Sequence, residues 1–291
     1  MDIHILLFYK FVSIKDPESL SRSHLEFCNS IGIKGKILLA KEGINGSVSG
    51  TKEQVEEYKK ELTSDPRFES IEFKEEIGSH HPFEKMVVKI KNEIIRLDKV
   101  VDIKNTGKHI SPKEFLEIYE QNKDVIILDA RNDYEFKAGR FKGAINPKID
   151  SFREFPDFIK TSNIPKDKPI IMYCTGGIRC EKACAYMIEQ GFTDVSQVHG
   201  GIINFCQQLP NTAWVGTCFV FDKRLTSNIN QGPSRDTFCT HCQSQCELYD
   251  NCKNKLCNDL IFICPNCEKD FHSCCSKECM KVLLSTPKLT N

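Results

Sequence analysis

The residues of this chain best suited to chemistry lie in one short segment, which reads Cys174, Thr175, Gly176, Gly177, Ile178, Arg179 and Cys180. An apolar run at 169–173 precedes the segment and a helical pattern at 181–188 follows it, so Cys174 is expected between a buried strand and a helix start. Unpaired backbone N–H groups and the helix dipole favour an anion there. The glycine pair lets the loop curl around the sulfur, and Arg179 adds positive charge. These features favour the nucleophilic thiolate, and a cysteine that only fills a core needs none of them.

The length of this loop narrows the chemistry. From Cys174 to Arg179 the spacing is C-x4-R, whereas cysteine phosphatases use C-x5-R. In this chain Cys180 occupies the position where the C-x5-R pattern has its arginine. The segment resembles the active loop of the rhodanese superfamily, whose cysteine carries persulfide sulfur in most members. Cys180 is a candidate second thiol, which either resolves an oxidised Cys174 or only fills space.

Composition limits the kinds of protein that fit. The 291 residues are enough for two or three domains, and 40 basic residues balance 40 acidic ones, so RNA binding is permitted but not predicted by charge. No apolar run approaches the ~20 residues that cross a bilayer, and Lys10 interrupts the apolar N-terminus, which is expected to be a strand and not a signal peptide. With 16 cysteines and a reactive thiol, we expect a cytoplasmic protein with metal sites.

The elements around the loop follow from patterning. Residues 1–98 are predicted to form an α+β ferredoxin-like domain of β-α-β-β-α-β order. Its helices are expected at 17–30, after Asp16, and from Thr51 to 62, because each begins with a capping residue. The first helix is expected to bury Leu20, Leu25 and Phe27 or their neighbours. The strands are expected at 3–12, 36–40, 47–49, 70–76 and 86–91, with a turn at 43–46.

Residues 99–215 are predicted to form an α/β rhodanese domain with a central parallel sheet. Apolar runs predict strands at 125–129, 143–145, 170–173 and 195–198. Ligands bind at the carboxyl ends of such strands, which brings Asp129, Arg131, Cys174, Gly200 and Gly201 together. Asp129 and Arg131 form a structural salt bridge between loops or support the site, and the first role does not exclude the second.

Residues 216–291 are predicted to form a strand and a small cysteine-rich metal-binding module. Its candidate ligands are Cys239, Cys242, Cys246, Cys252, Cys257, Cys264, Cys267, Cys274, Cys275 and Cys279. Two C-x2-C pairs fit adjacent corners of a tetrahedral thiolate site, and a module with so little apolar content needs metal to fold. We expect one or two structural zinc ions. An iron–sulfur cluster is the main alternative and disulfides the next. Spacing does not show which cysteines share an ion, and His241 or His272 could replace one.

Three features occur together: Gly43 to Gly46 in the first domain, Cys174 to Cys180 in the second, and Cys218 to Arg224 before a cysteine-rich tail. In this combination the chain resembles the rhodanese-domain tRNA uridine hydroxylases over nearly its full length. The resemblance implies oxygen-dependent formation of 5-hydroxyuridine at the tRNA wobble position, with Cys174 as catalytic residue and molecular oxygen and an unidentified reductant as co-substrates. The long cysteine-rich tail departs from members with a shorter end.

This reaction cannot be inferred from the residues alone. Hydroxylation needs activated oxygen, and neither a flavin fingerprint nor a two-histidine, one-carboxylate iron site is evident in the sequence. One hypothesis is attack of Cys174 on uracil C6, which makes C5 nucleophilic. tRNA is the expected partner, with no DNA and no membrane. Its expected contacts are Lys41, Asn45, Lys85, Lys89, Arg140 and Lys142, chosen as polar residues on adjacent segments. The alternatives are a sulfurtransferase that carries persulfide on Cys174, and a non-catalytic RNA- or protein-binding module.

Overall fold

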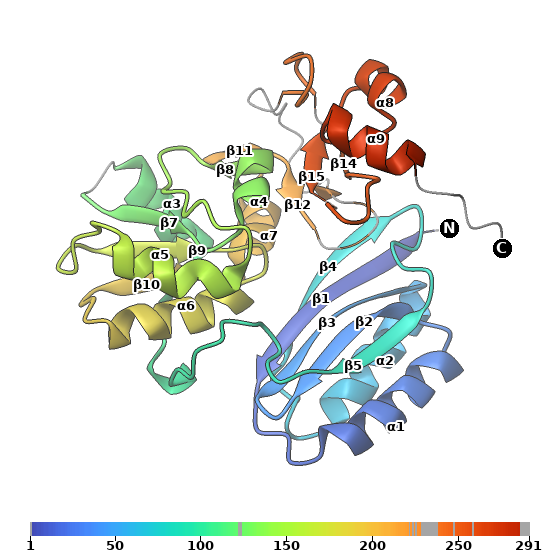
Figure 1. Cartoon of the computed structure of the whole chain (residues 1–291). Helices are drawn as coiled ribbons and strands as arrows, with labels where there is room; N and C mark the ends of the chain where they lie inside the picture. The colour runs from blue at the N-terminus through green and yellow to red at the C-terminus, as the bar shows by residue number, and fades with distance from the viewer. Residues whose placement is uncertain are drawn as a thin grey trace.

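The computed structural model describes residues 2–121, 124–220, 222, 224, 226–227, 238–246, 248–257 and 259–285. An N-terminal domain, a central domain and a C-terminal module follow one another along the chain (Figure 1). Phe221 and Lys223 of the expected strand at the module's start, and residues 228–237 of the linker after it, lie outside the described residues.

The N-terminal domain is a five-stranded sheet with two helices. Its elements are β1 (Ile3–Phe11), α1 (Pro17–Ser30), β2 (Lys34–Ala40), β3 (Gly43–Gly50), α2 (Lys52–Ser64), β4 (Glu72–Gly78) and β5 (Met86–Ile90). The strand order is β4-β1-β3-β2-β5, in which β5 runs parallel to β2 and the other pairs are antiparallel. The first four strands have the ferredoxin-like order, so the expected fold class is confirmed, and β5 extends it.

Both helices of this domain begin where the capping residues predicted. The side chain of Asp16 accepts a hydrogen bond from Ser19 N, and Thr51 and Gln54 form a capping box. The buried residues of α1 include His24 and Cys28. Of the two alternatives, the neighbours are the buried residues, whereas Leu20, Leu25 and Phe27 are partly buried and pack against the core.

The expected turn at 43–46 is wrong, because these residues begin strand β3 and the turn is formed by Lys41 and Glu42. The glycines serve close packing in the sheet. A Cβ atom added at Gly46 would lie 2.6 Å from the Phe8 ring, which is closer than real Cβ contacts allow. Glycine at this position therefore lets β3 pass over an aromatic side chain of β1.

The central domain is a four-stranded parallel sheet between helices. Its elements are η1 (Ile103–Asn105), β6 (Lys108–Ile110), α3 (Pro112–Glu120), β7 (Ile126–Asp129), α4 (Asp133–Ala138), β8 (Gly139–Phe141), η2 (Phe152–Glu154), α5 (Phe155–Thr161), β9 (Ile170–Tyr173), α6 (Ile178–Glu189), β10 (Val195–Val198), α7 (Gly201–Gln208) and β11 (Trp214–Gly216). The sheet order is β6-β10-β9-β7. One hydrophobic cluster packs α5 and α6 against this sheet and another packs α3 and α7, which confirms the predicted α/β class.

The expected strand at 143–145 is replaced by β8, which pairs antiparallel with β11. Gly143 adopts a left-handed conformation (φ +83°) after β8, and only Ile145 then makes a single parallel bridge to Leu128. The apolar run therefore marks an isolated bridge beside β7. Strand β6 at the opposite sheet edge was not expected.

The two domains meet across the open face of the N-terminal sheet. Helices α1 and α2 cover the face that points away from the central domain (Figure 1). Leu6 and Phe8 of β1 lie in the core beneath these helices. Leu7 and Tyr9 alternate with them and contact the loop that carries Cys174, since Cβ atoms added at Gly176 and Gly177 would lie 2.9 Å from these two side chains.

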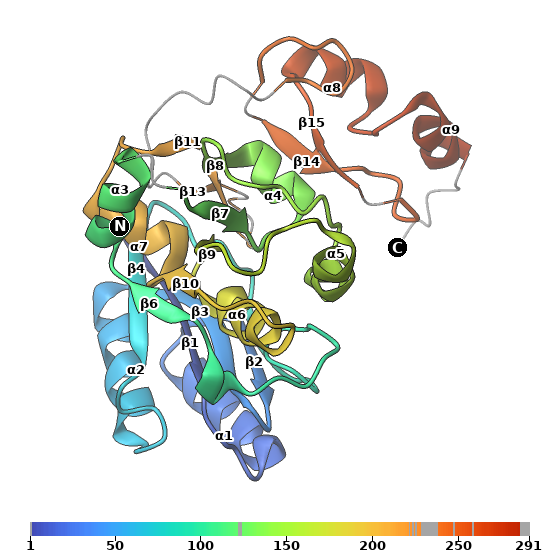
Figure 2. The ribbon, with the colours of Figure 1, turned by 90° about the vertical axis from the view of Figure 1, so that its left-hand side faces the viewer.

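The C-terminal module contains β12 (Cys218–Phe219), β13 (Thr226–Ser227), β14 (Tyr249–Asn251), β15 (Leu260–Phe262), α8 (Pro265–Phe271) and α9 (Lys277–Ser285). It packs on α4 through Phe219 and Phe262. Figure 2 shows α8 and α9 on the side of the molecule away from α1 and α2. None of the helices described in this structure is long and apolar enough to span a membrane.

Candidate active site

Cys174 lies directly after β9, in the turn that leads into α6. All four residues of β9 are buried, which fixes the strand end below the loop. Gly177 caps α6 with φ +101°, a left-handed conformation that glycine adopts without strain. In this conformation the Gly177 N–H donates a hydrogen bond to the Cys174 sulfur at 3.1 Å. The loop thus surrounds the sulfur as the glycine pair predicted.

The environment of Cys174 favours the thiolate. Burial alone would raise the pKa of this thiol. A hydrogen bond from the Cys180 thiol, the charge of Arg179 and the backbone N–H groups of Cys180 and Arg179 outweigh burial and lower the pKa to about 6. Burial raises the pKa of Cys180 well above its usual value, so Cys180 stays protonated and can donate. Cys174 is therefore mostly ionised at neutral pH.

The carboxylate partner of Arg179 is Glu135 on α4, a residue that the sequence did not single out. Two hydrogen bonds of 2.6 and 2.8 Å join the guanidinium to the carboxylate, and both side chains are buried. Thr175 Oγ1 donates to Glu135 at 3.2 Å and accepts from Arg179 at 3.1 Å. The only sequence signal was Asn132-x-x-Glu135, a capping pattern that marks the start of α4 and says nothing of an ion pair.

Asp129 and Arg131 form a second buried ion pair in which Arg131 Nη2 lies 2.7 Å from Asp129 Oδ2. Arg131 also donates to the carbonyl oxygen of Gly139 at 2.6 Å, and its guanidinium packs on the rings of Tyr173 and Trp214. Neither residue of the pair lines the cavity at Cys174. The pair ties β7 to β8, and a supporting role at the site stays a prediction.

A cavity of about 380 Å³ lies between the open face of the N-terminal sheet and the Cys174 loop. This volume is in the range of small-molecule sites, roughly 300–1,000 Å³. Its apolar walls are formed by Ile5, Leu7, Leu38, Phe83, Phe152 and Ile203. Cys174 lies among the residues around the cavity but has 0% exposed surface, so the loop or a side chain that covers the sulfur must shift before a substrate in the cavity can contact it. These walls suit the flat faces of a planar ring.

Among the residues predicted to contact RNA, Asn45 alone lines the cavity, and its amide donates to the Ile94 carbonyl at 2.9 Å. The predicted residues Lys41, Lys85, Lys89, Arg140 and Lys142 lie outside the cavity lining. Besides Arg179, which the sequence analysis singled out, the basic side chains that line it are Lys36, Lys74, Arg96 and Arg224. Sequence reasoning missed them because they belong to a face that only the docking of the domains defines.

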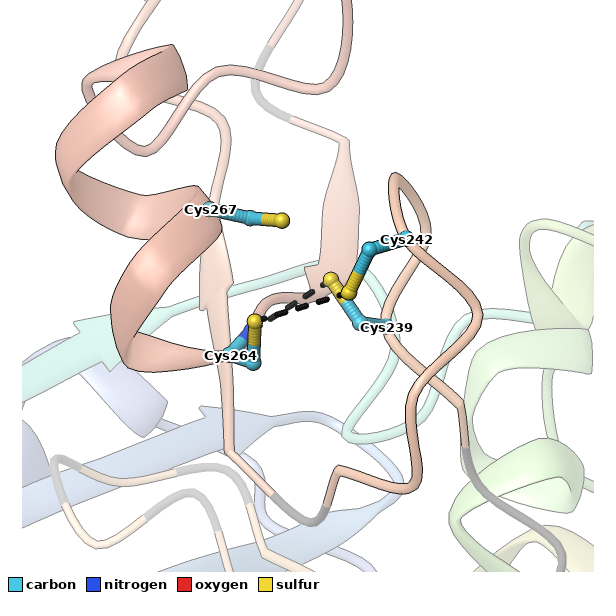
Figure 3. A group of neighbouring side chains, drawn as sticks. All are labelled: Cys239, Cys242, Cys264 and Cys267. Carbon is cyan, nitrogen blue, oxygen red and sulfur yellow. Dashed lines mark hydrogen bonds between the residues drawn. The ribbon is translucent and has the colours of Figure 1, made fainter.

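The cysteine-rich module forms two groups of four thiols. Cys239 and Cys242 lie on a loop and face Cys264 and Cys267 at the start of α8 (Figure 3). The second group comprises Cys252, Cys257, Cys275 and Cys279. Within each group the sulfur atoms all lie within 4.8 Å of one another.

This geometry fits tetrahedral metal sites. Zinc–sulfur bonds of about 2.3 Å place the sulfurs about 3.8 Å apart, and the Cys242–Cys264 separation is 3.7 Å. Cys246 and Cys274 were predicted as ligands, but their thiols instead donate to the carbonyl oxygens of Leu248 and His272.

Neither histidine joins a group within the described residues. The His241 ring stacks on Phe271 at 3.6 Å, and its Nε2 lies 2.9 Å from the Cys274 carbonyl oxygen. His272 is the left-handed residue that ends α8. The His241 ring therefore has a structural position.

Comparison with known proteins gives matches along most of the chain. Three family models match in succession: a UPF0176 acylphosphatase like domain at residues 3–94, a Rhodanese-like domain at 111–208 and a Rhodanase C-terminal region at 215–280. The curated relatives include proteins named tRNA uridine(34) hydroxylase from Bacillus cereus (strain B4264) and Bacillus anthracis (strain A0248). Each is 44% identical to this chain over 282 residues, covering 94% of this chain and 88% of the relative. A protein of the same name from Bacillus cytotoxicus is 44% identical over 285 residues, covering 94% and 87%.

Proposed function

The chain belongs to the tRNA uridine(34) hydroxylase family, and from this premise we propose that it hydroxylates the wobble uridine of tRNA at C5, with Cys174 as its catalytic residue. The observation that carries this proposal is a cysteine whose lowered pKa favours the thiolate, next to a cavity large enough for a nucleobase. We expect the enzyme to act in the cytoplasm, on the anticodon loop of tRNA.

In the proposed reaction the Cys174 thiolate adds to C6 of the uracil ring. A sulfur–C6 bond forms, the C5=C6 electron pair moves toward C4, and the O4 carbonyl becomes an enolate. C5 is then nucleophilic and can bond to an oxygen atom. Molecular oxygen and an external two-electron reductant supply that atom, and the second oxygen leaves as water. Loss of the C5 proton and departure of the thiolate restore the double bond and give 5-hydroxyuridine.

The surroundings of Cys174 support this role. Thiolate addition needs a nucleophile that is ionised at neutral pH but not hydrated. The loop N–H groups stabilise the charge while the apolar walls exclude water, and the Arg179–Glu135 ion pair fixes the loop on α4.

We propose that the two thiol groups of the C-terminal module each hold a zinc ion. Four thiolates give a closed coordination shell with no open position, which suits a structural ion that contributes folding free energy. Metal analysis together with an absorption spectrum tests the assignment, because an iron–sulfur cluster absorbs visible light and zinc does not.

The decisive experiment incubates the full-length protein with wobble-uridine tRNA, oxygen and a reductant, and then measures nucleosides by mass spectrometry. We expect 5-hydroxyuridine at position 34 with wild type and none with Cys174→Ala. An active Cys174→Ala variant would contradict the proposal. Thiocyanate formation from thiosulfate and cyanide without any hydroxylation would instead identify a sulfurtransferase.

A further inference from the structure

Lys74 differs from the other basic side chains at the cavity. Arg179 forms an ion pair with Glu135, and Arg224 forms ion pairs with Glu76 and Asp222. Arg96 contacts Asp98 in the same way. Lys36 on β2 borders the cavity but is exposed to solvent. Lys74 is half-buried and makes no salt bridge within the part of the chain that the structure describes.

The position of Lys74 is fixed by the sheet. Lys74 on β4 lies opposite Leu7 on β1, and its ammonium group lies 5.4 Å from the centre of the Tyr9 ring. The Tyr9 hydroxyl donates to Glu181 on α6 at 3.0 Å and contacts Gly177 of the catalytic loop. One tyrosine ring therefore links Lys74 to the loop that holds the nucleophile.

Lys74 and Cys174 also act on each other electrostatically. Burial lowers the pKa of Lys74, and the negative charges of Glu72, Cys174 and Glu181 oppose this effect. The N-terminal domain thus brings a poorly hydrated cation to the same cavity that receives the thiolate from the central domain. Neither domain alone contains both charges.

We infer that Lys74 is a second catalytic residue, whose ammonium group binds O4 of the uracil and stabilises the enolate as Cys174 adds to C6. This inference rests on the proposed function. Thiolate addition moves one electron pair from the C5=C6 bond toward O4, so negative charge leaves the sulfur and develops at that oxygen. A cation already held in a cavity with apolar walls stabilises such charge more than water does. Because Lys74 has no carboxylate partner among the residues that the structure describes, its ammonium group can donate a hydrogen bond to the substrate oxygen.

The test uses an anticodon stem-loop RNA with 5-fluorouridine at position 34, incubated without oxygen. Addition of Cys174 to C6 and protonation at C5 trap a covalent protein–RNA adduct, which denaturing gels and intact-mass spectra quantify. We expect Lys74→Met to slow adduct formation by about 10²-fold or more, the size of losing one oxyanion donor. Lys74→Arg, which keeps the charge, should retain adduct formation to within about 10-fold of wild type. Lys60→Met, which removes an exposed lysine of α2, should match wild type.

A second measurement separates an effect on the base from an effect on the thiol or the fold. Iodoacetamide alkylation of Cys174 at pH 8, where the thiolate is fully formed, should be the same in Lys74→Met as in wild type. Adduct formation at the wild-type rate in Lys74→Met overturns the inference and leaves Cys174 as the nucleophile. If Lys74→Met loses both alkylation and adduct formation, the inference is also overturned, because Lys74 then has a structural role. A wild-type enzyme that hydroxylates tRNA but gives no adduct refutes thiol addition itself.

Discussion

The guanidinium of Arg179 and the carboxylate of Glu135 meet through two parallel hydrogen bonds, in a site where both side chains are buried. The pair joins α6 to α4 across the loop of the nucleophile. Although burial would lower the pKa of Arg179, Glu135 raises it, so the arginine keeps the charge that acts on Cys174.

Replacing Glu135 by Gln keeps the size of the side chain but leaves Arg179 buried without a counter-charge. We expect Glu135→Gln to lower the free energy of unfolding by about 3–5 kcal/mol, measured by urea denaturation, because breaking a buried pair leaves an uncompensated ion. Asp157→Asn is the control, because Asp157 is exposed and its ion pair with Lys160 is long, at 3.7 Å. We expect this substitution to change the free energy of unfolding by less than about 1 kcal/mol. A similarly small change in Glu135→Gln contradicts this view of the pair.

The pKa of Cys174 predicts an unusual pH profile. Because the thiolate is the reactive form and the pKa is lowered to about 6, the alkylation rate should rise as pH increases through 6 and level off near pH 7.5. An ordinary cysteine keeps gaining reactivity up to about pH 9. Peptide mass spectrometry should find the label on Cys174 and not on Cys180. A midpoint above pH 8 contradicts the proposed stabilisation of the thiolate.

Gly201 closes the catalytic loop from the side of α7. It has a left-handed conformation (φ +67°), and an added Cβ would lie 2.4 Å from the Cys174 carbonyl oxygen and 2.8 Å from Gly177 N. Gly201→Ala should therefore lower both the melting temperature and the hydroxylation rate, because backbone strain of about 1–3 kcal/mol adds to a clash with the loop.

The matched control for this substitution is Gly143→Ala. Gly143 is also left-handed (φ +83°), but nothing lies within 4 Å of the added Cβ. This variant should show the strain alone and keep wild-type kcat once folded. Equal loss of activity in the two variants indicates that contact with the Cys174 loop is not what matters.

The two thiol groups predict a metal content of two ions per chain. Cys279→Ser removes a ligand of the second group and should reduce the content to one ion or fewer. Cys274→Ser is the control because Cys274 is buried and close in sequence but belongs to neither group. It should keep both ions. Equal losses in the two variants contradict the assignment of ligands.

Much of the fold could be predicted from local sequence. Pro17 and Thr51 mark helix starts, and the apolar runs before Asp129 and Cys174 become the adjacent parallel strands β7 and β9. Glycine was the least reliable signal. Gly46 allows close packing against Phe8 and does not form a turn. This packing depends on a neighbouring strand, which local sequence patterns do not reveal.

The candidate site could be predicted only where its residues are contiguous. The segment from Cys174 to Cys180 contains the proposed nucleophile, the glycines and the arginine. Glu135 and Lys74 come from another element and another domain, so only tertiary packing brings them to the site. The grouping of the cysteines depends on chain reversal between β14 and β15, because spacing alone allows several pairings.

The two groups of thiols alternate along the chain: the first and third cysteine pairs form one, and the second and fourth form the other. During synthesis, neither ligand shell can therefore close until the ribosome has released most of the module. The first shell needs Cys267 and the second needs Cys279. A message truncated between these codons would yield a tail able to hold the first ion but not the second, and such a product should be a preferred target of cellular proteases.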